Sequence, residues 1–299
     1  MGLGRRLGER AWLELRRATA AFEMRLARPP DAAAQVQLRL AYQALAAAGG
    51  PFPSLADIGF QAFSQTDEDG ILLYLFALVS ARERTCVEIC AGDGRECNTA
   101  NLIINHGWTG LLVDGDARLV ERGRRFYREH PHTRIAPPTF VHAWVTRDAV
   151  NDLVRSAGFS GEIDLLSIDL DGVDYWIWQA LDVVQPRVVV VEYQDILGAE
   201  RAVTVPYADD FDATRHPMTD GMPNYCGASL PAFVNLARSR GYRLVGCNRY
   251  GYNAFFVRDA LAGDALPEVS VHECLRRPHS QRGMRERYPT VAHLPWVDV

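Results

Sequence analysis

The 299-residue sequence contains no lysine, so its 32 Lys and Arg positions are all arginines. The formal net charge is −5, which leaves no global basic field to hold a nucleic acid, and we expect no nucleic-acid partner. No apolar run approaches the roughly 20 residues of a membrane span, so we expect no stable membrane insertion. The basic N-terminus has no apolar core of the kind that a secretory signal carries. Together these absences predict a cytoplasmic protein.

Metal-ligand and disulfide patterns are also missing from the sequence. The six cysteines form no CxxC pair and no Cys/His ligand spacing; they are Cys86, Cys90, Cys97, Cys226, Cys247 and Cys274. We therefore expect neither a structural zinc site nor a disulfide framework. Hydrophobic residues make up 48% of the chain and charged residues 23%, which is close to the average for globular proteins and allows a sizeable core. The length suits one large domain with appendages, or two small domains.

Residues 1–58 are predicted to form an N-terminal helical extension. Apolar side chains recur at helical spacing over residues 1–28, Pro29-Pro30 ends this segment, and Asp31 begins a second helix that runs to about Ala48. We expect these helices to pack on the main domain or to offer a surface for a homo-oligomer. A basic amphipathic contact with a membrane surface is the alternative.

From residue 66 onward the pattern alternates between strands and helices. Strands are predicted over 85–90, 110–114, 139–145, 163–168 and 187–193. Helices are predicted over 70–81, 98–106, 117–129, 147–157 and 174–183. Val188 to Val191 are all apolar, as in a parallel strand that is buried on both faces. This alternation predicts an α/β fold with a mostly parallel sheet covered by helices on both faces.

The end of the pattern differs from a dinucleotide-binding domain. A predicted helix over 229–240 leads to two strands, 242–247 and 253–257, that are joined by a short turn. Strands joined so tightly must be antiparallel. Five parallel strands followed by an antiparallel hairpin form the Rossmann-like sheet of class I methyltransferases. The corresponding domain is predicted over 59–258, and residues 259–299 form a C-terminal appendage.

The first predicted strand ends in an acid followed by glycines. Glu88 is followed by Cys90, Gly92 and Gly94, and this spacing suits a tight turn in which backbone approaches a ligand closely. Glu88 could accept a hydrogen bond from the ammonium group of a cofactor, directly or through water. Cys90 stands where the first glycine of the usual E/D-x-G-x-G-x-G pattern belongs. An ordinary turn between a strand and a helix is the alternative interpretation.

The second predicted strand supports a nucleoside site, because it ends in Asp114, 20 residues after Gly94. A carboxylate in this place can bind both hydroxyls of an adenosine ribose. Asp116 is a weaker candidate for the same role. A solvated acid at the end of a strand is the alternative.

Acidic residues also follow the fourth and fifth predicted strands, where parallel sheets place their ligands. Asp169 and Asp171 follow one strand and Glu192 ends the next. These three carboxylates are candidate catalytic residues, as a general base, and candidate ligands of a divalent cation such as Mg²⁺. Asp174 is expected to cap the helix that follows.

Residues 198–228 are irregular and rich in aromatic and acidic side chains, which is typical of a lid or an acceptor pocket. His216 in this segment could act as a base near neutral pH, although a surface position is the commoner outcome for a histidine. His106 and His142 are equally ambiguous.

Taken together, these residues resemble the FkbM-like methyltransferases over residues 60–258. The phrases that carry the resemblance are Phe63-Ser64-Gln65, Glu68-Asp69-Gly70, VEICAGDG with Asn98-Thr99, Gly107 to Gly110, IDLLSIDLDGVDYWIW, VVVVEYQ, VTVPY, GASL and Asn253 to Val257. Their co-occurrence is far more specific than any one of them. The resemblance implies binding of S-adenosylmethionine and transfer of its methyl group to a hydroxyl oxygen of a sugar or secondary metabolite.

By this resemblance Glu88, Gly92, Gly94, Asn98 and Asp114 are the expected donor-binding residues. Asp169 matches the aspartate that the family has after its fourth strand. Two positions depart from the family pattern: Cys90 replaces a glycine of the loop, and Gln194 stands where asparagine is common. The first bears on the affinity for the donor, and the second on the acceptor side or the metal.

Two other functions fit a sheet of this kind. An NAD-dependent oxidoreductase would need a complete GxGxxG turn, whereas Cys97 occupies the place of the last glycine here. A non-catalytic binding protein that keeps the methyltransferase fold is the second alternative. The identity of the small-molecule or glycan acceptor depends on the lid and the appendages rather than on the fold.

Overall fold

The computed structural model describes residues 31–299, so the helix predicted over 1–28 lies outside the described residues. The second predicted helix is confirmed as α2 (Ala32–Ala47), and the Asp31 side chain accepts a hydrogen bond from the Ala33 amide at its start. A short helix, α3 (Leu55–Ile58), links it to the main domain. Within residues 31–299, no helix is both long and apolar enough to cross a membrane.

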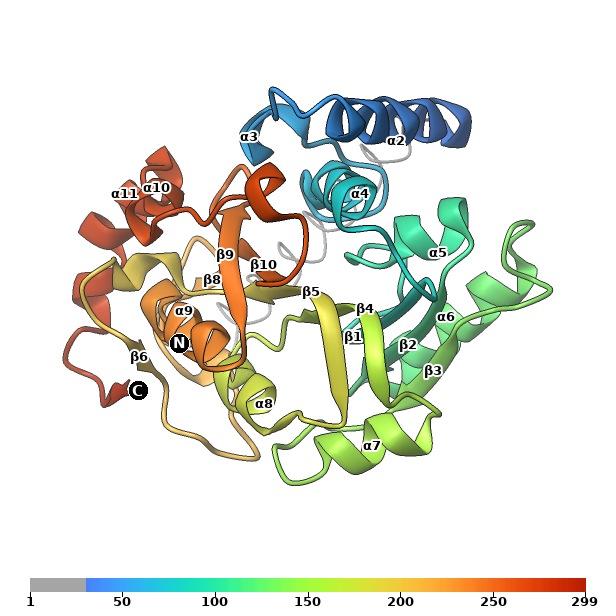
Figure 1. The fold of residues 1–299 in the computed structure, drawn as a ribbon. Coiled ribbons are helices and arrows are strands. Elements are labelled where there is room, and N and C mark those ends of the chain that lie inside the picture. The colour runs from blue at the N-terminus through green and yellow to red at the C-terminus, as the bar shows by residue number, and fades with distance from the viewer. Residues whose placement is uncertain (1–30) are drawn as a thin grey trace.

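A seven-stranded sheet forms the centre of the molecule (Figure 1). Its parallel strands are β1 (Thr85–Ile89), β2 (Thr109–Asp114), β3 (Thr139–His142), β4 (Gly161–Ile168) and β5 (Val184–Glu192). Two more strands, β9 (Tyr242–Cys247) and β10 (Asn253–Arg258), complete it in the order β3-β2-β1-β4-β5-β10-β9. The five predicted parallel strands are therefore confirmed.

The predicted terminal hairpin is also confirmed. β10 lies antiparallel to both β5 and β9, and it occupies the place between them. β10, which follows β9 in sequence, lies between β5 and β9. If only the seven strands of this sheet are numbered in chain order, the last three therefore lie in the order 5-7-6. This is the Rossmann-like methyltransferase sheet, and a dinucleotide-binding domain lacks this hairpin.

Helices cover both faces of the sheet (Figure 1). One face packs against α4 (Glu68–Val79), α5 (Ala100–His106) and α6 (Ala117–Glu129). The other packs against α7 (Val150–Ser156), α8 (Asp174–Ala180) and α9 (Leu230–Ser239). Both layers of apolar side chains are buried, which explains why the central strands are apolar on both faces.

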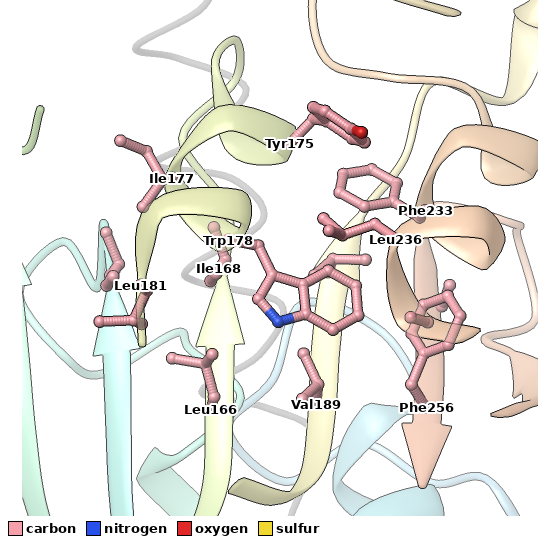
Figure 2. Packing of buried hydrophobic residues seen from close by; sticks show 14 of the residues in the cluster. Leu166, Ile168, Tyr175, Ile177, Trp178, Leu181, Val189, Phe233, Leu236 and Phe256 are labelled. Atoms are coloured by element: carbon pink, nitrogen blue, oxygen red, sulfur yellow. The ribbon is translucent and has the colours of Figure 1, made fainter. Parts of the chain in front are cut away.

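Trp178 anchors the second of these layers (Figure 2). Trp178 belongs to α8, and its side chain is 1% exposed. It packs against strands β4 and β5 on one side and against helix α9 on another. The Phe233 and Phe256 rings lie 6.1 and 5.4 Å from the Trp178 ring, centroid to centroid. A truncation of this side chain would cost about 3–5 kcal/mol of the free energy of unfolding, as for other large buried aromatics.

One predicted strand is shorter than expected. β3 ends at His142, three residues early, because Trp144 turns outward and its indole N–H donates to the Asp209 carbonyl. The C-terminal appendage forms two helices, α10 (Val271–Leu275) and α11 (Pro278–Glu286), and a short strand, β11 (Val297–Asp298).

The irregular segment after β5 is held by that appendage. β11 pairs antiparallel with β6 (Val203–Thr204), and a second small pair joins β7 (Met218–Thr219) to β8 (Met222–Pro223). Four short 3₁₀ turns punctuate the same half of the chain: Asp195–Leu197, Ala213–Arg215, Gly263–Ala265 and Tyr288–Thr290. A small separate core of Ile196, Val205, Tyr225 and Val291 seals the contact.

Candidate functional site

The loop that joins β1 to α5 has the backbone shape that its glycines predict. A Cβ added to Gly92 would meet no atom within 4 Å, so this residue presents bare backbone to open space. Gly94 differs, because a Cβ there would lie 2.9 Å from Phe140 and 3.0 Å from Leu112. Gly92 is therefore the glycine that leaves room for a ligand, and Gly94 is required by the core.

Cys90 adopts the conformation of the glycine that it replaces. Its φ is +68°, close to the +59° of Gly92 and the +69° of Gly94. A side chain held in this region costs about 1 kcal/mol or more. Burial and the nearby Asp114 carboxylate raise the pKa of the Cys90 thiol, so it is a poor nucleophile. The loop therefore holds a cysteine in a glycine-like conformation at the cost of local strain.

Glu88 points into the protein and holds this loop from beneath. Its side chain is 3% exposed, and its carboxylate accepts hydrogen bonds from the backbone amides of Asn98 and Thr99, each at 2.9 Å. The Ser167 hydroxyl also donates to it at 3.2 Å, and the Asn98 side-chain amide donates to that hydroxyl at 3.0 Å. Through these hydrogen bonds, Glu88 and Asn98 fix the shape of the loop.

Asp114 ends β2 beside the open side of the loop. One of its carboxylate oxygens accepts from the Gly92 amide and the other from the Asp116 amide, both at 2.8 Å. Each oxygen keeps a second lone pair, so the pair of oxygens is held in place to accept hydrogen bonds from two adjacent hydroxyls. Asp116 caps α6 by accepting from the Arg118 amide at 2.7 Å, which accounts for this residue without a ligand.

A pocket of about 80 Å³ opens at the carboxyl ends of β1 and β2. It is lined by Cys90, Asp114, Gly115, Ala143, Trp144, Val145, Leu170, Val173, Ala208, Asp209 and Phe211. Small-molecule sites usually enclose about 300–1,000 Å³. Residues 208–211 form a roof over the pocket: the Trp144 indole is bonded to Asp209, and Phe211 packs on Gly172 so closely that a Cβ there would lie 2.4 Å from its ring.

Three carboxylates gather next to this pocket at the ends of β4 and β5. Single oxygens of Asp169, Asp171 and Glu192 all lie within 4.8 Å of one another. Asp169 and Glu192 lie close enough to influence each other's protonation. Burial raises the pKa of both carboxyls well above the ordinary range, and the neighbouring carboxylates raise it further. The structure thus brings the three predicted catalytic residues together.

Asp174 holds the turn on which this cluster stands. It was expected to cap α8, but its carboxylate accepts from the preceding amides of Leu170, at 2.6 Å, and Gly172, at 2.9 Å. The turn needs this support because Asp171 has a φ of +55°, a left-handed conformation. Burial raises the pKa of Asp174 to about 6.

A polar brace at the start of α4 joins the helix to the terminal hairpin. The Glu68 carboxylate accepts from the Thr66 hydroxyl at 2.8 Å and from the side-chain amides of Asn248, at 2.7 Å, and Asn253, at 3.0 Å. Asn253 is paired in register with Glu192. The sequence alone does not reveal this brace, because its partners are 180 and 185 residues apart.

Gln194 and the histidines lie outside the cluster of carboxylates. The Gln194 amide donates to the Cys226 sulfur at 2.9 Å and to the Pro223 carbonyl, so it holds the segment that leads to α9. The His216 ring lies against Phe211 and Tyr225 under the roof segment, with centroid distances of 5.6 and 4.7 Å. Of the other two candidates, His142 is exposed and His106 lies at the opposite edge of the sheet.

No family model matches the sequence, and no curated protein sequence matches it. Similar solved structures include the magnesium protoporphyrin IX methyltransferase ChlM of Synechocystis PCC 6803 with bound SAM, at 12% identity and a TM-score of 0.35 over 74% of this chain and 78% of that one. The CcbJ methyltransferase of Streptomyces caelestis has 15% identity and a TM-score of 0.40 over 69% and 97%. The methyltransferase domain of bacterial CtHen1 has 13% identity and a TM-score of 0.41 over 64% and 98%.

Proposed function

We propose that this chain is an S-adenosylmethionine-dependent methyltransferase that methylates a hydroxyl oxygen of a small-molecule or sugar acceptor. The observation that carries the proposal is the juxtaposition of two features at one edge of a methyltransferase sheet. A pocket lined by Asp114 opens beside the glycine loop, and the Asp169, Asp171 and Glu192 carboxylates stand next to it. Open α/β sheets bind their ligands at this edge.

The donor would occupy the pocket with its ribose against Asp114. Both carboxylate oxygens of Asp114 are oriented by backbone amides, so they can accept from two ribose hydroxyls without rearrangement. Leu170 and Val173 offer an apolar wall for the adenine ring, and the indole of Trp144 stands at its edge. The bare backbone at Gly92 leaves space for the amino-acid end of the donor. Residues 208–211 would have to lift to admit it.

The carboxylate pair would take the proton of the acceptor. In the reaction a hydroxyl oxygen forms a bond to the methyl carbon while the carbon–sulfur bond breaks, and the electron pair of that bond neutralises the sulfonium. The hydroxyl proton then has to leave, and a deprotonated Asp169 or Glu192 can accept it. Because the donor is already activated, the rest of the rate enhancement comes from holding the oxygen and the methyl group in line.

The donor set of Asp169, Asp171 and Glu192 also fits a hard divalent cation such as Mg²⁺. All three offer carboxylate oxygens, and the spacing within 4.8 Å suits a single ion. When bound, such an ion would lower the pKa of the acceptor hydroxyl. Asp169 and Glu192 would then orient the acceptor.

Calorimetric titration with S-adenosylhomocysteine and with NAD⁺ tests the donor site. We expect S-adenosylhomocysteine to bind and NAD⁺ not to bind. An Asp114→Asn variant should weaken binding of S-adenosylhomocysteine at least about tenfold, since it loses charged hydrogen bonds to the ribose. The matched control is Asp116→Asn, two residues along the chain. Asparagine can still cap α6 there, so this variant should bind S-adenosylhomocysteine with native affinity. Binding of NAD⁺ alone would instead favour an oxidoreductase.

Transfer of a labelled methyl group to a panel of hydroxylated acceptors, with Mg²⁺ or with EDTA, tests catalysis. We expect the labelled methyl group to appear in a methyl ether of the acceptor. Loss of activity with EDTA would favour a role for a bound divalent cation. If Asp169→Asn keeps full activity and EDTA has no effect, the cluster is not catalytic. If S-adenosylhomocysteine binds but no acceptor is methylated, the protein is better described as a non-catalytic binding protein of this fold.

A further inference from the structure

A second, larger pocket lies at the amino ends of the parallel strands, opposite the carboxyl ends where the proposed donor site lies. Its volume is about 250 Å³, and it is lined by Arg39, Gln43, Leu73, Phe76, Ser80, Ala81, Arg84, Leu102, His106 and Trp108. Arg84 immediately precedes β1 and Trp108 immediately precedes β2, so the pocket opens at the amino ends of these strands. Cys90 and Asp114 follow the carboxyl ends of the same strands, which separates the two pockets by the length of a strand, roughly 16 Å.

The floor of this pocket is apolar and aromatic. Leu73, Phe76, Leu102 and Trp108 are all buried, and the Phe76 and Trp108 rings meet edge to face at 4.6 Å. The walls come from three elements that pack together: α2, the end of α4 and the end of α5. A pocket with such a floor accepts a flat, apolar body.

The mouth, in contrast, carries two cationic side chains. Arg39 approaches from α2 and Arg84 from the loop before β1, and both lower the pKa of His106 between them. Neither arginine forms an ion pair with a carboxylate within residues 31–299, and the buried Nε of Arg39 has no hydrogen-bond partner there. Most other arginines near a carboxylate in this part of the chain are paired, as Arg187 and Arg258 are with Glu162.

His106 adds no charge to this pair of arginines. Its Nε2 lies 2.8 Å from the Gln35 side-chain oxygen, which also accepts from Asn101, so Nε2 carries the proton and donates. Burial lowers the pKa of His106 to about 4, with Arg39 and Arg84 contributing, so the ring is neutral at pH 7. The two guanidinium groups are therefore the positive charges of the pocket.

Arg84 is kept at this position at some cost to the backbone. Its φ is +54°, a left-handed conformation that glycine adopts far more easily. The Thr109 amide donates to the Arg84 carbonyl at 2.8 Å and fixes this geometry beside Trp108. Arg84 is exposed, so the positive φ, rather than the missing ion pair, is what marks this residue at the mouth of the pocket.

We propose that this arginine pocket binds a small organic anion whose carboxylate or phosphate lies between Arg39 and Arg84 and whose flat, apolar body contacts Phe76 and Trp108. Guanidinium groups hold such anions through charged, often bidentate hydrogen bonds. The site is distinct from the donor pocket and does not depend on the proposed methyl transfer.

Titration with 2-naphthoate, followed by calorimetry and by tryptophan fluorescence, tests the proposal on the full chain. We expect saturable binding with a stoichiometry of one. Naphthalene-2-methanol, which lacks the charge, and inorganic phosphate, which lacks the apolar body, should each bind at least about tenfold more weakly. Equal binding of the neutral alcohol, or no binding of 2-naphthoate at millimolar concentration, would overturn the proposal.

Variants connect the binding to the two arginines. Arg84→Gln and Arg39→Met should each weaken 2-naphthoate at least about tenfold, whereas Arg125→Gln, an exposed arginine on α6 without an ion pair among residues 31–299, should bind normally. Arg39→Met should in addition raise the unfolding midpoint of the ligand-free protein, because it removes a buried Nε without a partner. A purely structural arginine would give the opposite result, a lower midpoint. Affinity for S-adenosylhomocysteine should be unchanged in all three variants.

Discussion

The two halves of the proposed active site hold their buried acids in opposite ways. In the loop after β1, Glu88 accepts hydrogen bonds from two backbone amides and two hydroxyls, so its charge is fully compensated. At the ends of β4 and β5, burial and the nearby carboxylates raise the pKa of Asp169 and of Glu192, which favours their protonated forms. The same residue type thus serves as a fixed support in one half and as a proton-binding group in the other, and the difference lies in the donors that surround it.

The largest effect is expected when the support that Glu88 gives to the loop is removed. Glu88→Gln keeps the size of the side chain but points an amide N–H₂ at donors that need an acceptor. We expect the free energy of unfolding to fall by about 3–5 kcal/mol, as when one partner of a buried charged network is removed. Urea unfolding measures this. A loss below about 1 kcal/mol would mean that the loop does not depend on Glu88.

Asp169→Asn should have the contrasting effect. We expect methyl transfer to fall at least about 100-fold, since a general base is lost, while the free energy of unfolding stays the same or rises. The stability holds because the substitution removes one of two buried like charges that compete for a proton. Rate measurements and urea unfolding on the same preparation check this. A variant that is both inactive and unstable would place Asp169 with Glu88 among the supports.

Stability should depend on pH through Asp169 and Glu192. Because the pKa of Asp169 and of Glu192 is raised in the folded state, the folded protein keeps protons that the unfolded chain releases above about pH 4. Their contribution to stability is therefore complete below that pH and is lost as the pH rises through the raised values. With EDTA present, the Asp169→Asn, Glu192→Gln double variant should show a flatter dependence of unfolding free energy on pH than the native chain. An equal slope in both proteins would contradict the raised pKa of these two carboxyls.

The smallest effect is expected at Cys90. Cys90→Gly should raise the free energy of unfolding by about 0.5–1 kcal/mol at most, because relief of the strain at φ +68° outweighs the greater freedom of glycine in the unfolded chain. Affinity for S-adenosylhomocysteine should stay within about twofold of native, since the loop already has the glycine shape. Thermal unfolding and calorimetry measure the two. A large gain in affinity would show that the cysteine distorts the donor site.

The order of strands and helices along the chain could be predicted from the sequence. Runs such as Val188 to Val191 must be buried on both faces, and the tight turn before Asn253 allows only an antiparallel return. Asp169, Asp171 and Glu192 could be placed at one edge for the same reason, because the carboxyl ends of neighbouring parallel strands meet there. These inferences depend on local periodicity, which a single segment displays by itself.

The tertiary structure alone decided what each acid does. Glu88 and Asp114 both end strands and look alike in sequence, yet Glu88 is enclosed by the amides of Asn98 and Thr99 while Asp114 lines a pocket. The brace from Glu68 to Asn253 and the arginine pocket at the other edge were not predicted either. A residue's hydrogen-bond partners come from segments far away in the chain, so the sequence determined where the acids and arginines lie along the fold, and only packing determined which of them are compensated and which remain available to a ligand.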